Sequence, residues 1–239
     1  MTHSFLRFEE INSTNDYLLE NYDSLEDGTV VIAFSQLSGK GRRGRSWLSS
    51  EGMLPFSILL KGDKYEKARS VLPLIAATSL IAALAKKGID AYLKWPNDVY
   101  LNNKKCAGIL LEGVYKEKQE AIVIGIGINV NQTSFPSSLP LATSLRMETK
   151  KEFDLDEITE SFLKEFDETL EDYLAGGEKY LTIARKKDYL YGKTITLNYY
   201  GENITGVAAG IAKDGSLSLK KDDGETITIT SGEASLHQD

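Results

Sequence analysis

The distribution of apolar and turn-forming residues changes near residue 193, and this change limits the possible fold more than any other feature of the sequence. Beyond that point, four short runs rich in β-branched residues follow one another closely: TITLNYY, ITGVAAGIA, SLSLK and TITIT. They are separated by the pairs Gly201-Glu202, Asp214-Gly215 and Asp223-Gly224, which are typical of turns between strands. We therefore expect a small antiparallel β-barrel at residues 191–239 and a separate, larger domain at residues 1–190.

The larger part mixes strand-like and helix-like segments without strict alternation. Apolar and β-branched runs predict strands at residues 5–8, 29–35, 54–60, 107–115 and 121–130. Helices are expected at residues 16–21, at 65–87 before Gly88, and from Leu155 to Leu170, where apolar residues recur at helical spacing after a possible cap at Asp154. The pattern predicts an α+β fold with a mixed β-sheet and flanking helices.

Charge and cysteine content exclude several classes of protein. The formal net charge is −7, so a general basic surface for nucleic acid or anionic lipid is missing and any anion site must be local. The single cysteine, Cys106, cannot form an internal disulfide, and the first residues lack the apolar core of a signal peptide. The longest apolar stretch, Val71 to Ala85, is shorter than the roughly 20 residues of a membrane span. We expect a cytoplasmic protein with no membrane partner.

The densest group of positive charges lies in the segment GKGRRGRSW at residues 39–47. Its cations, Lys40, Arg42, Arg43 and Arg45, alternate with glycines. Glycines let backbone N–H groups approach phosphate, and arginine side chains match its oxygens, so this loop can wrap an anion. No G-K-[ST] follows at the spacing of a Walker loop. The alternative is a solvated basic loop, with Trp47 either covering a planar ligand or filling the core.

A second polar group follows a predicted strand in the segment KWPND. Lys94 is a candidate for a phosphate contact, and Asp98 for a Mg²⁺ ligand or a proton acceptor. The alternative is that Asn97-Asp98 forms a turn fixed by Pro96 and that Lys94 lies at the surface.

The next two strands carry residues that are unusual for strands. Lys105 precedes a small-residue, apolar run, and a buried lysine needs an anionic partner, unless it marks the exposed end of the strand. Gly125 and Gly127 alternate along the following strand, which either leaves its backbone open to a ligand or indicates close packing.

Taken in order, these segments resemble the catalytic core of the biotin–protein ligases over almost the whole chain. The matching motifs are STN at 13–15, GxGRRGRxW at 39–47, KWPND at 94–98, KxAGIL at 105–110 and GIGIN at 125–129. The resemblance implies a class II aminoacyl-tRNA synthetase-like catalytic fold for residues 1–190, and GxxxGI at 206–211 resembles the family's SH3-like C-terminal barrel.

The resemblance also implies roles for individual residues. It assigns biotin binding to Ser13, Thr14, Asn15, Gln36, Lys40, Gly41, Arg42, Lys105, Gly108, Gly125 and Gly127. It assigns ATP and adenylate binding to Arg42, Arg43, Arg45, Trp47, Lys94, Asn97 and Asn129. Catalytic roles fall to Lys105, Arg42 and Asp98, with Asp98 also the candidate Mg²⁺ ligand.

The activity implied is the ATP-dependent activation of biotin to biotinyl-5′-AMP, followed by transfer to a lysine of a biotin carboxyl carrier protein domain. ATP and biotin are then substrates, Mg²⁺ is the metal, and the chain is a monomer or a homodimer. The STN motif lies close to Met1, which leaves no room for the DNA-binding domain of bifunctional members, so no nucleic acid partner is expected.

Two departures from the family pattern affect the expected pocket. Lys40 stands where the family has its first loop arginine, which keeps the charge but loses the two-pronged hydrogen bonding. Met53-Leu54-Pro55 replaces a glycine and aromatic segment in the wall.

Three other functions remain open from the sequence. A lipoate–protein ligase shares the fold, and a non-catalytic biotin or nucleotide regulator would also need a binding pocket. An RNA-binding protein would use the arginine loop with the C-terminal barrel, but the acidic balance argues against it.

Overall fold

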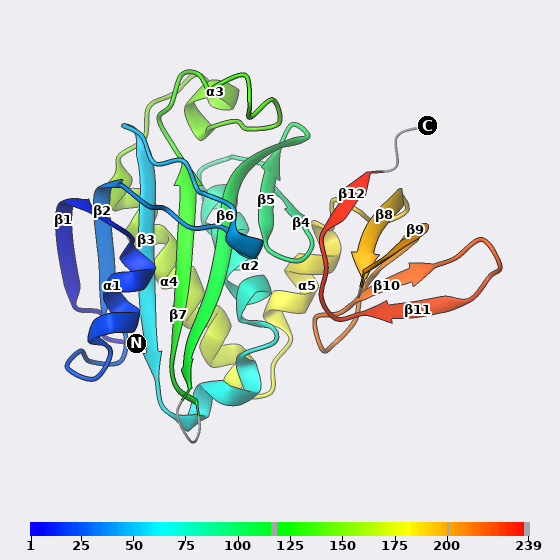
Figure 1. Cartoon of the computed structure of the whole chain (residues 1–239), viewed down its shortest axis with the longest axis horizontal. Coiled ribbons are helices and arrows are strands. Elements are labelled where there is room, and N and C mark those ends of the chain that lie inside the picture. The colour runs from blue at the N-terminus through cyan, green and yellow to red at the C-terminus, as the bar shows by residue number, and fades with distance from the viewer. Residues whose placement is uncertain (116–118, 200, 237–239) are drawn as a thin grey trace.

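The computed structural model describes residues 1–115, 119–199 and 201–236. Within these residues its centre is a seven-stranded mixed sheet in the order β1-β2-β3-β7-β6-β5-β4, in which β1 and β2 pair in parallel and the other described neighbours pair antiparallel (Figure 1). The strands are β1 (Phe5–Ile11), β2 (Val30–Gln36), β3 (Met53–Lys61), β4 (Tyr92–Lys94), β5 (Asp98–Leu101), β6 (Lys104–Tyr115) and β7 (Gln119–Asn129). The expected α+β fold with a mixed sheet is confirmed.

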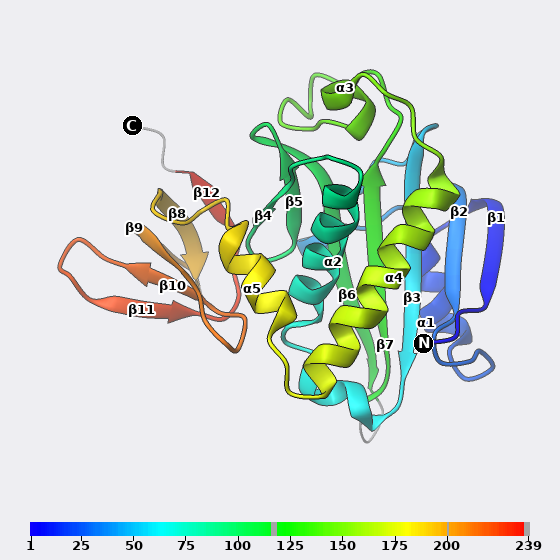
Figure 2. The ribbon, with the colours of Figure 1, turned by 180° about the vertical axis from the view of Figure 1, so that it is seen from behind.

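Helices cover the two faces of this sheet unequally. The long helices α2 (Leu72–Lys86) and α4 (Leu155–Leu174) cross one face side by side (Figure 2), whereas the short α1 (Thr14–Asn21) lies on the other. Because β3 is covered on both sides, its residues 53–60 are all buried, which explains its continuous apolar run. The exposed part of the α1 face is the area left for a binding site.

Packing on the two faces forms two apolar cores. The larger core lies under α2 and α4, where the Phe56 and Phe162 rings meet edge to face with centroids 5.3 Å apart. The smaller core, under α1, contains Leu18, Leu59 and Val123. Side chains of successive strand residues point to opposite faces, so the register that seats Leu59 and Val123 under α1 also fixes which residues beyond them face the open area.

Helix boundaries differ from the expected ones at one place. The helix expected at 65–87 is divided into a 3₁₀ turn, η2 (Asp63–Ala68), and α2, which begins at Leu72. Pro73 explains the break, because proline lacks an N–H group and is accommodated in the first turn of a helix but not in its interior. Asp154 caps α4 as expected, accepting hydrogen bonds from the backbone of Asp156 and Glu157.

The C-terminal residues form a separate five-stranded antiparallel sheet in the order β11-β10-β9-β8-β12. Its strands are β8 (Thr194–Tyr199), β9 (Glu202–Ile211), β10 (Leu217–Lys220), β11 (Thr226–Ile229) and β12 (Ala234–Leu236). The expected antiparallel strands are therefore present. Within the described part of the chain, β11 and β12 do not pair, so the ladder is that of an open sheet rather than a closed barrel.

The remaining helices connect these units. α3 (Leu145–Thr149) lies in the long connection after β7, and α5 (Lys179–Lys186) leads from α4 to the C-terminal sheet. Among the described residues, none of the helices has the length and apolar character required to cross a membrane.

A histidine ties the chain before β1 to helix α4. His3 Nδ1 lies 2.9 Å from the carbonyl oxygen of Gly28, and Nε2 lies 3.1 Å from Asp167 Oδ1. Burial disfavours charge on the ring, but the hydrogen bonds to Asp167 and Gly28 outweigh it and raise the pKa of His3 above its ordinary value. Both partners only accept hydrogen bonds, so the geometry suits the doubly protonated ring.

We expect His3→Gln to lower the free energy of unfolding by about 1–2 kcal/mol at acidic pH and by less at alkaline pH. A group with a raised folded pKa stabilises fully below its unfolded pKa of about 6.5, and this contribution is lost as the pH rises through the folded pKa. Urea unfolding of parent and variant between about pH 5.5 and 8.5 measures the difference. A difference that stays constant over this range would contradict the assignment.

Candidate functional site

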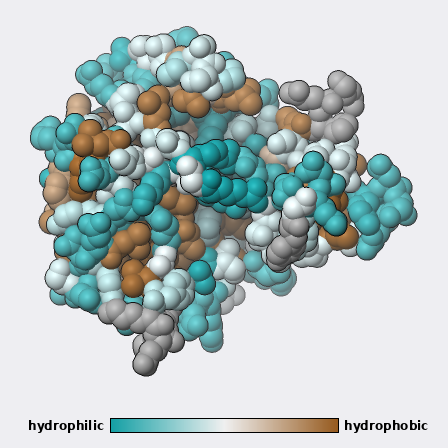
Figure 3. All heavy atoms as spheres, viewed as in Figure 1, coloured by the Kyte–Doolittle hydropathy of each residue, from teal (hydrophilic) through white to brown (hydrophobic). Residues whose placement is uncertain are grey.

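A cavity of about 360 Å³ opens on the α1 side of the main sheet. It is lined by segments far apart in the sequence, among them the 13–15 motif, the basic loop, the 94–98 turn and the adjoining ends of β6 and β7. In the space-filling view, strongly hydrophilic surface crosses the middle of this face, where η1 (Arg42–Gly44) of the basic loop lies in Figure 1 (Figure 3). The motifs predicted to act together thus meet at one cavity.

Every predicted site residue except one lines this cavity. They are Ser13, Thr14, Asn15, Gln36, Lys40, Gly41, Arg42, Arg45, Trp47, Lys94, Asn97, Asp98, Lys105, Gly108, Gly125, Gly127 and Asn129. The exception is Arg43, which has a left-handed backbone with φ of 55° at the exposed tip of the loop. Its neighbour Gly44, at φ 72°, completes the tight turn that separates Arg42 from Arg45.

The floor of the cavity is a part of the sheet without side chains. Gly108 of β6 pairs with Gly127 of β7, and Gly125 lies two residues further along on the same face. The Trp47 indole fills the space above: a Cβ atom at Gly127 would lie 2.4 Å from Trp47 Cε2. From the sequence, Trp47 either covers a planar ligand or fills the core. This contact supports the first interpretation, because it places the indole at the cavity.

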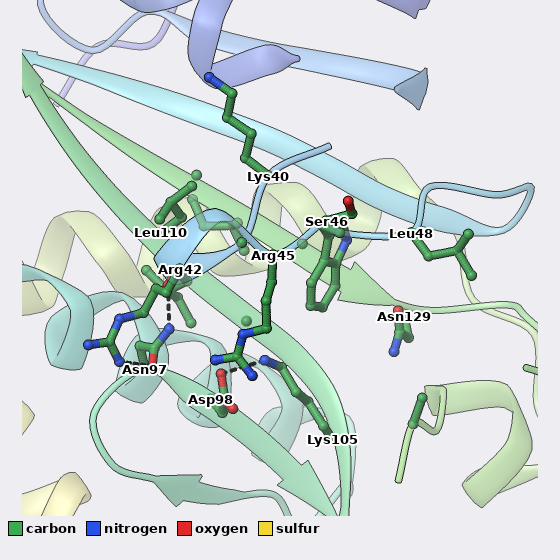
Figure 4. A pocket seen from close by; sticks show the side chains of 18 of the residues that line it. Lys40, Arg42, Arg45, Ser46, Leu48, Asn97, Asp98, Lys105, Leu110 and Asn129 are labelled. Carbon is green, nitrogen blue, oxygen red and sulfur yellow. Dashed lines mark hydrogen bonds and ion pairs between the residues drawn. The ribbon is translucent and has the colours of Figure 1, made fainter. Parts of the chain in front are cut away.

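One end of the cavity carries the positive charge. Arg42 Nη1 donates to Asn97 Oδ1 over 2.9 Å, and Lys105 Nζ lies 2.7 Å from Asp98 Oδ1 (Figure 4). Burial lowers the pKa of Arg42, and burial likewise lowers the pKa of Lys94. Burial removes water from these two cations, and the protein does not fully replace the interactions lost with that water. An anion bound in the cavity would therefore stabilise them.

The 94–98 turn both shapes the chain and faces the cavity. Lys94 and Asp98 are paired residues at the ends of β4 and β5, joined by the tight connection through a cis Trp95-Pro96 bond. Asn97 is buried, and its Nδ2 donates to the carbonyl oxygen of Ile109 over 2.7 Å. In the sequence, turn formation and a ligand site at residues 94–98 are alternatives. In the structure the two go together, because these residues form a hairpin turn and all of them line the cavity.

The opposite end is polar and mostly uncharged. Gln36 Oε1 accepts hydrogen bonds from the backbone N–H of Thr14 over 2.8 Å and from its hydroxyl over 3.0 Å. Lys40, by contrast, points away from the cluster at Arg42 (Figure 4). It forms an ion pair with Asp16 of α1. The lysine that replaces the expected arginine therefore anchors the loop to α1 in this structure.

Several residues at or near the cavity were not anticipated from the sequence. Glu233, from the C-terminal sheet region, lines the cavity and forms an ion pair of 2.6 Å with Arg45. The segment at residues 135–142 forms a further wall, held to β6 where Lys105 N donates to the Leu141 carbonyl over 2.7 Å. Ser57, a polar residue inside the apolar run LPFSILL, is fully buried behind the polar end, and that mismatch was a usable signal.

Comparisons with known proteins agree on one family. Residues 7–129 match the family model described as the biotin/lipoate A/B protein ligase family, and residues 191–237 match that of the biotin protein ligase C-terminal domain. The solved biotin protein ligase from Aquifex aeolicus in complex with biotin and ATP superposes with a TM-score of 0.88 at 33% identity, covering 99% of both chains.

Curated relatives give the same result at similar identity. The chain is 34% identical over 211 residues to the bifunctional ligase/repressor BirA of Bacillus spizizenii, covering 83% of this chain and 63% of that protein. It is 34% identical over 217 residues to BirA of Escherichia coli, covering 89% of this chain and 68% of that protein. The chain thus spans about two thirds of the length of these relatives.

The contact of the Trp47 indole with the glycines of the cavity floor can be tested by adding a single methyl group. We expect Gly127→Ala to push the Trp47 indole off the sheet at a cost of about 1–3 kcal/mol of stability, as in other overpacked sites. The tryptophan emission should shift to longer wavelength and become more sensitive to acrylamide. In a Trp47→Phe background the same substitution should leave the emission unchanged. An unaltered spectrum in the single variant would show that the indole does not rest on Gly127.

Proposed function

Because the chain belongs to the biotin/lipoate A/B protein ligase family, we propose that it is a biotin–protein ligase acting on a lysine of a biotin carboxyl carrier domain. The observation that carries the proposal is the single cavity with a polar, largely uncharged end at Thr14 and Gln36 and a cationic end at Arg42, Lys94 and Lys105. A biotin molecule with a polar ring system and a carboxylate, joined to a nucleotide phosphate, has the same order of groups.

In the first step, a carboxylate oxygen of biotin attacks the α-phosphorus of ATP, and pyrophosphate leaves. The protein's contribution is to hold the two anions together and to stabilise the charge that develops on the phosphoryl oxygens. Lys105 is the proposed partner of the reacting carboxylate and α-phosphate, and its present pairing with Asp98 holds its ammonium group at the cavity. Arg42, held by Asn97, is proposed to bind the same phosphate.

In the second step, the acceptor lysine amine attacks the acyl carbon and AMP leaves. The amine must first lose a proton, since its ordinary pKa is about 10.4. Asp98 is the proposed acceptor for that proton, and its side chain is one-fifth exposed at the cavity. Closure of the basic loop would exclude water, which otherwise hydrolyses a mixed anhydride.

A magnesium ion is proposed as part of the ATP substrate complex. Among the described residues no group of three or more His, Cys, Asp or Glu side chains could hold a metal ion. The residues present fit a Mg²⁺ held mainly by phosphate oxygens with Asp98 as a single carboxylate ligand, which is the usual arrangement for this ion. When bound, it would neutralise phosphate charge.

Of the two acids that the family name includes, biotin is favoured over lipoate by the polar end of the cavity. This end is lined by the buried Thr14 and Asn15, which are paired within the protein, and by the half-buried Gln36, whose amide can pair with a polar ring but gains little from the dithiolane ring of lipoate. Mass spectrometry of a carrier domain incubated with ATP and either acid tests the proposal: a gain equal to biotin supports it, and a gain seen only with lipoate would refute it.

We also propose the domain division at residues 1–190 and 191–239, with the second unit completing the site. Support comes from several contacts between the units besides the Arg45–Glu233 pair, among them two hydrogen bonds from buried aromatic residues. Trp95 Nε1, buried beside Pro96, donates to the Gly215 carbonyl over 2.9 Å, and Tyr180 donates to the Lys213 carbonyl over 2.6 Å.

Variants of Arg42 and Lys105 should separate retention of the intermediate from its synthesis. We expect Lys105→Ala to lower adenylate synthesis by about 10²–10³-fold, as for loss of one donor to a developing charge. Arg42→Ala should reduce synthesis less but release free biotinyl-adenylate, because the loop loses its contact with Asn97. Pyrophosphate release and free adenylate are measured without acceptor, with the exposed, distant Arg7→Ala as control. Tight retention of the adenylate by Arg42→Ala would refute the lid role.

A second test addresses the contact of the C-terminal sheet with the loop. We expect Glu233→Gln to raise the KM for ATP by about threefold to tenfold, because Arg45 loses the partner that holds it at the cavity. The pair is partly exposed, so stability should change by less than about 1 kcal/mol. Glu225→Gln, which affects a surface pair with Lys221 in the same sheet, is the matched control. Equal KM values for the two variants would contradict the proposal.

A further inference from the structure

We propose that Ser57 and Glu112, neither of which lines the cavity, position its polar end and set its preference for acids whose head group accepts hydrogen bonds. The proposal rests on the proposed function and deepens it by naming the class of acid. Both residues lie on the α1 side of the sheet: Ser57 of β3 is opposite Gly125 of β7, and Glu112 lies along β6.

The side-chain amide of Asn15 is held from both ends. Its Nδ2 donates to Glu112 Oε2 over 2.7 Å, and its Oδ1 accepts from Ser57 Oγ over 2.5 Å. A carboxylate can only accept hydrogen bonds, so Glu112 determines which end of the amide is which. The amide also lies against the sheet, where a Cβ atom at Gly125 would be 2.3 Å from Asn15 Oδ1. Asn15 is thus committed to this network.

The Gln36 side chain is oriented in the same way from the other direction. The backbone N–H of Thr14 can only donate, so the atom that it meets must be Gln36 Oε1. The Thr14 hydroxyl donates to the same oxygen. The NH₂ group of Gln36 takes part in neither of these hydrogen bonds, and Gln36 lines the cavity, so this group is the donor that the side chain can offer to a ligand.

Ser57 joins these two parts. The Thr14 hydroxyl uses its own hydrogen on Gln36, and Asn15 presents its oxygen, so these two acceptors share the one hydroxyl hydrogen of Ser57, whose Oγ lies 2.7 Å from Thr14 Oγ1 and 2.5 Å from Asn15 Oδ1. Ser57 has no exposed surface. Without its hydroxyl, both acceptors lose a donor in a buried place, and the preferred directions of the Thr14 and Asn15 groups are no longer determined.

The chemistry of the ligand follows from the donors of Gln36. A head group with a urea or amide carbonyl pairs with them, whereas a dithiolane offers only sulfur, a weak acceptor, and leaves them unpaired. A site built around buried donors rejects ligands that cannot pair with them. The network therefore discriminates against lipoate without touching either acid.

The test compares Ser57→Ala and Glu112→Leu with Glu112→Gln, which keeps an acceptor oxygen for Asn15. We expect the first two to raise the KM for biotin by about tenfold and to reduce the preference for biotin over lipoate, with the KM for ATP and kcat within about twofold of the parent. Glu112→Gln should recover most of the affinity. Ser79→Ala removes an equally buried hydroxyl that bonds to the Ile75 carbonyl of α2 and the Glu165 carbonyl of α4, on the other face of the sheet, and should change neither constant.

A second readout does not depend on catalysis. The side-chain amide ¹H–¹⁵N resonances of Asn15 and Gln36 should both shift in Ser57→Ala without ligand, and neither should shift in Ser79→Ala. Unmoved resonances, or an unchanged KM for biotin in Ser57→Ala and Glu112→Leu, would overturn the positioning role. If the parent activates neither acid, the proposed function fails, and the resonances then decide by themselves whether the network orients Gln36.

Discussion

The cavity depends on a part of the central sheet that has no side chains on its α1 face. Gly108 and Gly127 lie opposite each other on adjacent strands, and Gly125 follows on the same face. A methyl group at Gly127 would collide with the Trp47 indole, and one at Gly125 would collide with the Asn15 amide. The exposed backbone of these glycines thus leaves space for the Trp47 indole and for the polar end with Asn15, and the cavity forms without requiring distortion of the surrounding sheet.

Charge in the cavity is balanced only in part by the protein itself. Lys105 has Asp98 and Arg45 has Glu233, but Arg42 is held by a neutral amide and Lys94 lies over the ring of Tyr100. Burying cations with incomplete pairing is unfavourable unless a ligand supplies the missing charge. A site of this kind gains most from a polyanionic substrate, and this agrees with the structural similarity to a ligase that binds ATP with biotin.

The C-terminal sheet contributes to the same site although it is a distinct unit in the sequence. Its apolar residues, among them Ile195, Ile211 and Leu217, belong to the same core cluster as those of α2, and Gly215 packs against Leu74. Trp95 connects the two units directly, since it belongs to the turn between Lys94 and Asp98 and its N–H group donates to the Gly215 carbonyl. A displacement of the small sheet would therefore be transmitted to the 94–98 turn and, through the Arg45–Glu233 pair, to the basic loop.

The sequence by itself determined most strands of the main sheet, the helices α1, α2 and α4, the strand-rich character of the chain after residue 193 and the kinds of residue that gather at the cavity, because these depend on local patterns: alternation in β7, turn pairs after residue 193, and glycines among the cations of the loop. It did not determine the break of the helix before α2 or the open edge between β11 and β12. Only the tertiary structure decided which side chains meet: that Lys40 pairs with Asp16, that Arg43 stays outside the cavity, that Ser57 lies behind its polar end against Thr14 and Asn15, and that Glu233 lines it from the C-terminal part of the chain. Such contacts follow from the order and register of the strands. A register shift of one residue would turn every side chain of a strand to the opposite face of the sheet, and no local pattern of the sequence specifies these contacts.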